Sequence, residues 1–169
     1  MTAAYLALGS NLGARAANLS QALRLLEDDR LRTARVSSVY ESAPMYFADQ
    51  PAFLNLVAEV RTTLSPEELL ERCHRVERAL GRERLMKNGP RTVDVDILLY
   101  AKRVVSTPAL EIPHPRLAER RFVLEPLAEL APRRTHPVLR RTIADLLGEV
   151  MNQRQRRLGG LEEVCGGAA

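Results

Sequence analysis

The chain has 169 residues, of which 46% are hydrophobic and 27% are charged, and its formal net charge is +4. This length suits one domain with its own core and is short for two. We therefore expect a single domain over residues 1–152, followed by a frayed tail over 153–169 that is basic and then rich in glycine and alanine. No apolar run approaches the roughly 20 residues that span a bilayer, so we expect no membrane association.

The two cysteines, Cys73 and Cys165, lie far apart and lack the spacing of a zinc site. The N-terminal residues contain no charged segment followed by an apolar stretch, so a secretory signal is not expected. A reduced, cytoplasmic protein without structural zinc fits these features. Arginine greatly outnumbers lysine, which suits the binding of phosphate oxygens, although a basic chain is also compatible with nucleic-acid binding.

Hydrophobic patterns predict alternating strands and helices along the first hundred residues. Strands are expected over 3–8, 32–40, 53–62 and 92–100, and helices around 19–26 and over 66–80. The second helix has a capping box, with Ser65 at the N-cap and Glu68 at N3, and Gly81 supplies a stop.

This order of elements indicates an α+β protein with a ferredoxin-like α/β sandwich, in which helices cover one face of a mainly antiparallel sheet. The remaining segments are expected to elaborate that core. They are a hairpin over 103–112, a rigid Pro-His-Pro turn at 113–115, and helices over 122–130 and 139–150.

The most informative segment is 89–96, which reads Gly-Pro-Arg-Thr-Val-Asp-Val-Asp. Side chains alternate along a strand, so Asp94 and Asp96 point the same way, with Cα atoms about 7 Å apart. Two adjacent carboxylates at the mouth of a buried strand favour a bound cation, and Mg²⁺ commonly takes one or two carboxylates. The alternative is that both aspartates are solvated at an exposed strand end.

The loop between Gly81 and Pro90 is rich in positive charge. Arg82, Arg84 and Lys87 lie within it, and Arg91 follows its end. We interpret this loop as a hinged lid that clamps polyphosphate against a metal held by the two aspartates. The alternative is a solvated run of charges.

Three further features have weaker implications. Phe53 and Asn55 share one strand face, and a ring beside an amide suits a planar heterocycle, although such a phenylalanine is often core. His114, between two prolines, is a candidate phosphate contact or a buried, hydrogen-bonded histidine. The glycine-flanked segment 9–13 lacks the Lys-Ser/Thr pair of a phosphate loop and is expected to be a strand-to-helix turn.

Together these segments resemble the 6-hydroxymethyl-7,8-dihydropterin pyrophosphokinase family of folate biosynthesis. The matching segments are 5–12, 49–51, 53–55, 89–96, 112–115 and 120–122. The resemblance implies a ferredoxin-like fold and an enzyme that transfers the β,γ-diphosphate of ATP, its co-substrate, to the hydroxymethyl oxygen of the dihydropterin and releases AMP. It also implies that Asp94 and Asp96 bind two Mg²⁺ ions.

The resemblance further implies a role for each matching residue. Catalytic roles fall on Arg82, Arg91, Asp94 and Asp96. The pterin pocket is formed by Ser42, Ala43, Pro44, Met45, Phe53, Asn55 and Phe122. ATP is bound by Glu77, Arg82, Arg84, Arg91, Ile97, His114 and Arg120. The chain departs from the family at Asn88, where a tryptophan is frequent, and at Ala109 and Glu111, which replace polar residues.

Two other functions are open at this point. A nucleotidyltransferase with a Gly-Ser turn and an Asp-x-Asp metal pair would transfer AMP and release pyrophosphate. A non-catalytic RNA-binding module of ferredoxin-like fold would need exposed aromatic platforms on its sheet, but aromatic residues make up only 4% of the chain. We expect a monomer that acts on small molecules and binds no nucleic acid.

Overall fold

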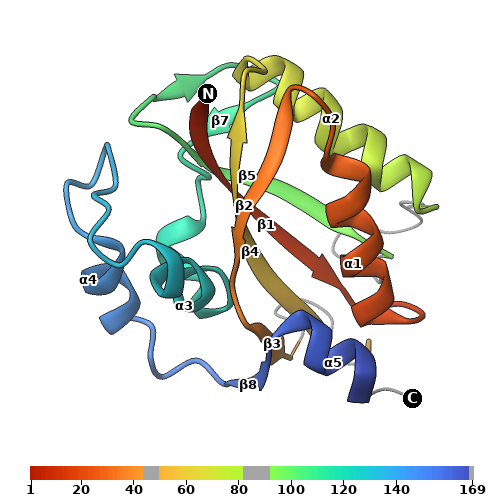
Figure 1. Ribbon diagram of the computed structural model, residues 1–169. Helices are drawn as coiled ribbons and strands as arrows, with labels where there is room; N and C mark the ends of the chain where they lie inside the picture. The colour runs from red at the N-terminus through yellow and green to blue at the C-terminus, as the bar shows by residue number, and fades with distance from the viewer. Residues whose placement is uncertain (44–49, 82–91, 168–169) are drawn as a thin grey trace.

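The computed structural model describes residues 1–43, 50–81 and 92–167, and every structural statement below concerns those residues. Its centre is a six-stranded sheet in the order β5-β1-β4-β3-β8, with β2 also paired to β4 (Figure 1). All of these pairs are antiparallel. The strands are β1 (Thr2–Ser10), β2 (Leu31–Val36), β3 (Val39–Ser42), β4 (Phe53–Thr62), β5 (Asp94–Tyr100) and β8 (Gln155–Gly159).

Helices α1 (Arg15–Leu26) and α2 (Pro66–Ala79) cover one face of the sheet. The predicted capping box starts α2, because Ser65 Oγ accepts from the Glu68 N–H at 3.1 Å and the Glu68 carboxylate accepts from the Ser65 N–H at 3.0 Å. Gly81 follows with φ +77°, the left-handed conformation that ends many helices. In the described ranges, no helix combines the length and the apolar character needed to cross a membrane.

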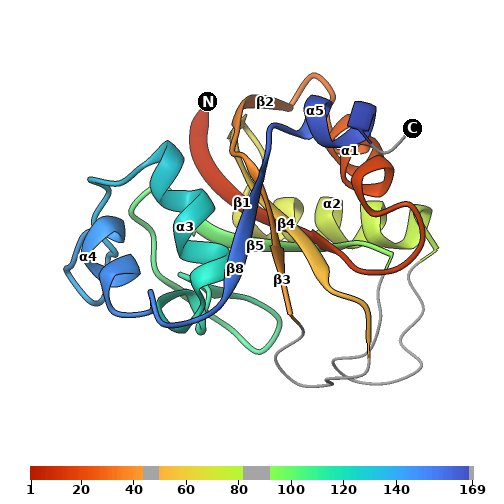
Figure 2. The ribbon, with the colours of Figure 1, turned by 90° about the horizontal axis from the view of Figure 1, so that it is seen from below.

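The predicted mainly antiparallel sheet with helices on one face is confirmed, and the later helices that were expected to elaborate this core cover the opposite face. Helices α3 (Arg121–Leu130) and α4 (Ile143–Gly148) pack there, as Figure 2 shows. The physical reason is that β1 and β4 also present large side chains, Tyr5 and Val57, on this side. Both are almost completely buried under Leu124 and its neighbours, because apolar surface on both faces of a sheet requires cover on both.

Several predicted elements have different bounds in the structure, and three of the differences are described here. The strand expected over 32–40 breaks at Ser37, whose Oγ donates to the Ser38 carbonyl at 2.8 Å and accepts from the Val57 N–H at 2.9 Å. The helix expected over 139–150 begins only after Thr142, which caps it by accepting from the Asp145 N–H. The predicted hairpin is confirmed as the shorter pair β6 (Val105–Ser106) and β7 (Glu111–Ile112), and a 3-10 turn (Leu117–Glu119) precedes α3.

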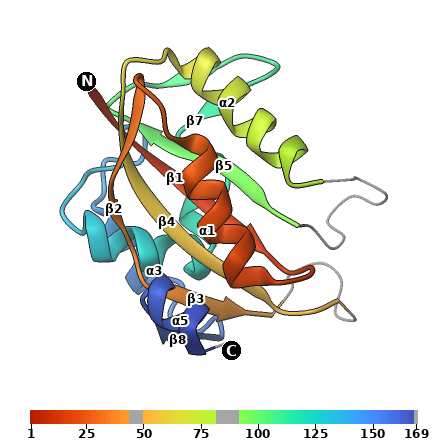
Figure 3. The ribbon, with the colours of Figure 1, turned by 45° about the vertical axis from the view of Figure 1, so that its right-hand side comes forward.

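The expectation that the chain frays after residue 153 is also wrong. The segment Gln155–Gly159 is β8, which pairs with β3 at the edge of the sheet. Helix α5 (Leu161–Gly167) then returns to the face that carries α1 (Figure 3), where Leu161 and Val164 pack against the core. Without β8, the backbone groups on the outer side of β3 would lack strand partners, and pairing with them orders this basic segment.

Candidate active site

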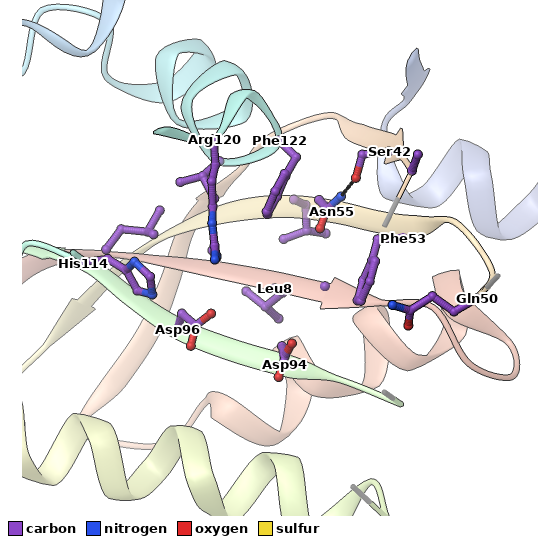
Figure 4. A pocket seen from close by; sticks show the side chains of 16 residues that line it. Leu8, Ser42, Gln50, Phe53, Asn55, Asp94, Asp96, His114, Arg120 and Phe122 are labelled. Atoms are coloured by element: carbon purple, nitrogen blue, oxygen red, sulfur yellow. Dashed lines mark hydrogen bonds between the residues drawn. The ribbon is translucent and has the colours of Figure 1, made fainter. Parts of the chain in front are cut away.

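A pocket opens at one end of the sheet, on the face covered by α3 (Figure 4). Strands β1, β4 and β5 form its floor, the end of β3 forms one side, and the N-terminal end of α3 forms another. Nine residues predicted for the site line it, namely Ser42, Ala43, Phe53, Asn55, Asp94, Asp96, His114, Arg120 and Phe122. The topology thus brings together residues that lie up to 80 positions apart in the chain (Ser42 to Phe122: 122 − 42 = 80).

The floor of the pocket is built around Gly9 of β1. Gly9 pairs with Asn55 of β4 on one side and with Asp94 of β5 on the other, and Ala7 pairs with Asp96. A Cβ atom at Gly9 would lie 3.0 Å from Asn55 Oδ1 and 3.6 Å from Phe53 Cδ1. Glycine is therefore needed here for space, because a side chain would push into the amide group.

Asp94 and Asp96 point from β5 into the same pocket (Figure 4), whereas Val95 between them is buried on the other side. Asp94 is half-buried and Asp96 is exposed. Within the described ranges, no three His, Cys, Asp or Glu side chains come together as a metal-ligand group. A cation here would take two carboxylates and complete its shell with water and substrate oxygens, so the donor set fits Mg²⁺ and does not fit structural zinc.

Asn55 is held in one orientation by its neighbour on β3. Its side chain is almost completely buried, and Nδ2 donates to Ser42 Oγ at 2.8 Å. The rings of Phe53 and Phe122 lie on either side of Asn55 in Figure 4, one from β4 and one from α3. Two aromatic faces and a fixed amide can bind a flat, polar heterocycle by stacking and by edge hydrogen bonds.

His114 and Arg120 lie at the end of the pocket that contains Asp96 (Figure 4). The backbone N–H of His114 donates to the Leu98 carbonyl at 3.0 Å, and its Nδ1 accepts from the Arg116 N–H at 3.1 Å. Burial, followed by the positive charges of Arg120 and Arg116, lowers the pKa of His114 to about 4. The imidazole is therefore neutral at pH 7 with its proton on Nε2, which can donate to a substrate oxygen.

Two predicted ATP-binding residues do not line this pocket. Glu77 is buried on α2, where Oε2 accepts from the Val95 N–H at 2.9 Å and so supports β5 from behind. The Ile97 side chain is buried in the core beneath the helices, so only its backbone is available to a ligand. The remaining predicted site residues, Pro44, Met45, Arg82, Arg84 and Arg91, lie outside the described residues.

Sequence reasoning missed seven lining residues, most of them on the floor. These are Ala7, Leu8, Gly9, Leu56 and Leu98 of the floor strands, with Gln50 before β4 and Val123 on α3. A signal was present in β1, where residue size falls along one face from Tyr5 through Ala7 to Gly9. Gln50 is connected to the turn after β1, because its Oε1 accepts from Asn11 Nδ2 at 2.9 Å.

Comparison with known proteins shows which family this chain resembles. Residues 5–132 match the family model described as 7,8-dihydro-6-hydroxymethylpterin-pyrophosphokinase. The Bacillus subtilis protein named 2-amino-4-hydroxy-6-hydroxymethyldihydropteridine pyrophosphokinase is 49% identical over 128 residues, which cover 75% of this chain and 77% of the relative. The Aquifex aeolicus protein of the same name is 41% identical over 149 residues, covering 88% and 92%.

Other relatives are much longer than this chain. The Pneumocystis carinii folic acid synthesis protein fol1 is 41% identical over 150 residues, which are 89% of this chain but only 20% of that protein. The crystal structure of a Plasmodium falciparum HPPK-DHPS triple mutant superposes with a TM-score of 0.70 at 19% identity, covering 88% of this chain and 44% of that one. This likeness supports the ferredoxin-like fold.

The family match includes the pocket described above, since every described residue that lines the pocket lies within residues 5–132. The predicted resemblance is thereby confirmed. This chain belongs to the 7,8-dihydro-6-hydroxymethylpterin-pyrophosphokinase family.

Proposed function

We propose that this chain transfers the β,γ-diphosphate of ATP to the hydroxymethyl oxygen of 6-hydroxymethyl-7,8-dihydropterin and releases AMP, as a step in folate biosynthesis. One observation carries the proposal. A single pocket joins a part suited to a heterocycle, with Phe53, Asn55 and Phe122, to a part suited to metal and phosphate, with Asp94 and Asp96. The names of the bacterial relatives describe the same chemistry.

In the heterocycle part of the pocket, Phe53 and Phe122 stack on the two faces of the pterin. Asn55 reads its polar edge, and Ser42 fixes the amide through the 2.8 Å hydrogen bond. Binding in this way orients the hydroxymethyl group toward the aspartates. Holding two reactants in a reactive geometry supplies much of the rate enhancement in reactions of this type.

In the phosphate part, Asp94 and Asp96 hold Mg²⁺, for which two ions are implied by the family resemblance. When bound, Mg²⁺ neutralises phosphate charge and lowers the pKa of a nearby hydroxyl. The hydroxymethyl oxygen forms a bond to the β-phosphorus, the bond from that phosphorus to the α,β-bridging oxygen breaks, and the hydroxyl proton passes to solvent. Arg120 and the neutral His114 donate to phosphate oxygens, while Arg82, Arg84 and Arg91 are proposed to clamp the triphosphate from the 81–91 loop.

We also propose that the protein works in the cytoplasm, as a monomer and without nucleic acid. Cys73 and Cys165 are free thiols, which fits a reducing compartment. Burial raises the pKa of the Cys73 thiol, so this side chain is packing and not a nucleophile. Both faces of the sheet are packed against helices, and this arrangement argues against the open aromatic platform of an RNA-binding module.

The test is incubation of the protein with ATP, Mg²⁺ and 6-hydroxymethyl-7,8-dihydropterin, followed by separation of the nucleotides. The proposed reaction yields AMP and a pterin diphosphate in equal amounts. Release of pyrophosphate with adenylated pterin would instead identify a nucleotidyltransferase. No pterin-dependent consumption of ATP would refute both enzyme assignments.

A further inference from the structure

The segment 151–157 lies outside the residues that match the family, 5–132, yet it contacts two walls of the pocket. At one end it meets the start of α3, which carries Phe122. At the other end it pairs with β3, which carries Ser42. Figure 2 shows β8, the edge strand of the sheet, running from the region of α3 alongside β3.

At the start of α3, Gln153 supplies a cap that the helix itself lacks. Arg120 is the N-cap residue and makes no side-chain capping hydrogen bond. The first backbone N–H of the helix, that of Arg121, instead donates to Gln153 Oε1 at 2.9 Å. The Gln153 Nε2 group donates to the Glu119 carbonyl at 2.7 Å, so one side chain holds the backbone on both sides of Arg120.

The Arg121 side chain reinforces this connection. Its Nη1 donates to the carbonyls of Met151 and Gln153, at 3.0 and 2.7 Å, and its Nε pairs with Glu125 at 2.7 Å. Only 18% of the Arg121 side chain is exposed, and its contacts with Gln153 and Glu125 are partly buried. By contrast, the ion pair between Arg156 and Glu41 is formed by an arginine side chain that is 73% exposed, and such pairs contribute little.

At its other end, the segment pairs with β3, the strand whose Ser42 is hydrogen-bonded to Asn55. Gln155 is the register partner of Ser42, and Ser42 accepts the hydrogen bond from Asn55. The Gln155 Nε2 group also donates to Glu125 of α3 at 2.5 Å. Residues 153–155 therefore connect the helix bearing Phe122 to the strand that orients Asn55.

We propose that Gln153 is a positioning residue for pterin binding, which acts by fixing the first turn of α3 and hence the place of Phe122 relative to Asn55. The inference rests on the proposed function, because it assumes that the pterin lies between those two groups. Gln153 touches neither substrate. It sets the width of the slot into which the heterocycle fits.

The experiment compares Gln153→Ala with Gln153→Glu and with Asn152→Ala, a neutral change at the exposed preceding residue. Binding of 6-hydroxymethyl-7,8-dihydropterin is followed by its fluorescence, since the chain has no tryptophan to interfere. Turnover gives KM and kcat, and thermal unfolding gives Tm. A glutamate still accepts from the Arg121 N–H at the positive end of the helix but loses the donor to the Glu119 carbonyl, whereas alanine loses both hydrogen bonds.

We expect Gln153→Ala to raise the Kd and KM of the dihydropterin about fivefold, the effect of losing a typical N-cap. Gln153→Glu keeps one of the two hydrogen bonds, so its Kd and KM should rise less than those of Gln153→Ala, and Asn152→Ala should match the parent protein. Unchanged pterin affinity in Gln153→Ala would overturn the proposal, as would equal losses in the alanine and glutamate variants. A loss explained by the unfolded fraction alone, calculated from Tm, would also overturn it. A parent protein that binds pterin but forms no AMP would refute the proposed function, while the binding comparison would still decide the role of Gln153.

Discussion

Replacing Gly9 by alanine tests the architecture of the pocket floor with a single methyl group. The new Cβ would lie 3.0 Å from Asn55 Oδ1, a contact so close that the amide would have to move by a few tenths of an ångström. The nearest other atoms are Phe53 Cδ1 at 3.6 Å and the Leu54 carbonyl at 3.8 Å, which are ordinary contacts. The strain therefore falls on the group that is proposed to read the pterin edge.

Two opposing terms act on stability. A Gly-to-Ala change at a compatible backbone position stabilises a protein by about 0.4–1 kcal/mol, because it restricts the unfolded chain. Moving the Asn55 amide weakens its 2.8 Å hydrogen bond to Ser42, which costs about 1 kcal/mol. The free energy of unfolding should therefore change by less than about 1 kcal/mol.

Substrate binding has no such compensation. Misplacing the amide removes one or more hydrogen bonds to the pterin edge, at about 1–3 kcal/mol, which corresponds to a rise of roughly 5- to 150-fold in the KM for the dihydropterin. The KM for ATP should stay within about twofold, because no atom of Asp94 or Asp96 is among the three nearest to the added methyl group.

The assay is steady-state AMP formation with each substrate varied in turn, together with urea unfolding. Gly148→Ala is the matched control, since Gly148 ends α4 with nothing within 4 Å of its added Cβ. The control should keep both KM values. An unchanged dihydropterin KM in Gly9→Ala would refute the claim that glycine keeps space for Asn55, and an equal rise in both KM values would show that the whole pocket had shifted.

Two further changes test the other end of the pocket. Asp94→Asn should lower kcat by about 100-fold or more and raise the Mg²⁺ concentration needed for half-maximal rate, because a metal ligand and its charge are lost; full activity at ordinary Mg²⁺ would contradict the metal assignment. Burial, with the charges of Arg120 and Arg116, lowers the pKa of His114 to about 4, so the folded protein binds this proton less readily than the unfolded chain. Stability should therefore be insensitive to this group above about pH 6.5 and fall as pH drops toward 4, by roughly 3 kcal/mol in full. The measurement is the free energy of urea unfolding as a function of pH, and in His114→Asn it should fall less between about pH 6.5 and 4 than in the parent protein. A smaller fall due to His136, whose pKa is also lowered by burial, should remain. An unaltered pH dependence would show that the folded protein tolerates a charged His114.

Local sequence patterns predicted those features that depend on one helix or strand alone. The alternation over residues 53–62 predicted β4 with its bounds and both of its faces, and the capping signals at Ser65 and Glu68 predicted the start of α2. The spacing of Asp94 and Asp96 predicted that both carboxylates point the same way, and both line the pocket. In each case the information lies within a few residues of the feature.

The predictions failed where the outcome depends on a distant partner. Nothing near residues 153–159 indicates that the outer side of β3 is available for pairing, so the local pattern predicts a basic tail. The contact of Glu77 with the Val95 N–H, eighteen positions along the chain, is likewise not visible in any local pattern. The alternating pattern over residues 32–40 could not show that the strand breaks at Ser37, between β2 and β3. The Ser37 side chain accepts a hydrogen bond from the Val57 N–H, which belongs to another strand.

The central strand β1 explains how one sheet can carry both a core and a polar pocket. On the side under α1 and α2, the middle of the strand is apolar, and Ala4, Leu6 and Leu8 belong to the core there. On the other side, size falls from Tyr5 through Ala7 to Gly9, so that cover by α3 and α4 gives way to open space toward the end of the strand. Tyr5 is buried with its hydroxyl donating to Glu59 at 2.9 Å, whereas Gly9 leaves room for the Asn55 amide. Polar and charged groups are costly inside an apolar core and far less costly beside water or substrate. A gradient of side-chain size along one strand face therefore places Asn55, Asp94 and Asp96 at the end of the sheet that ligand and solvent can reach.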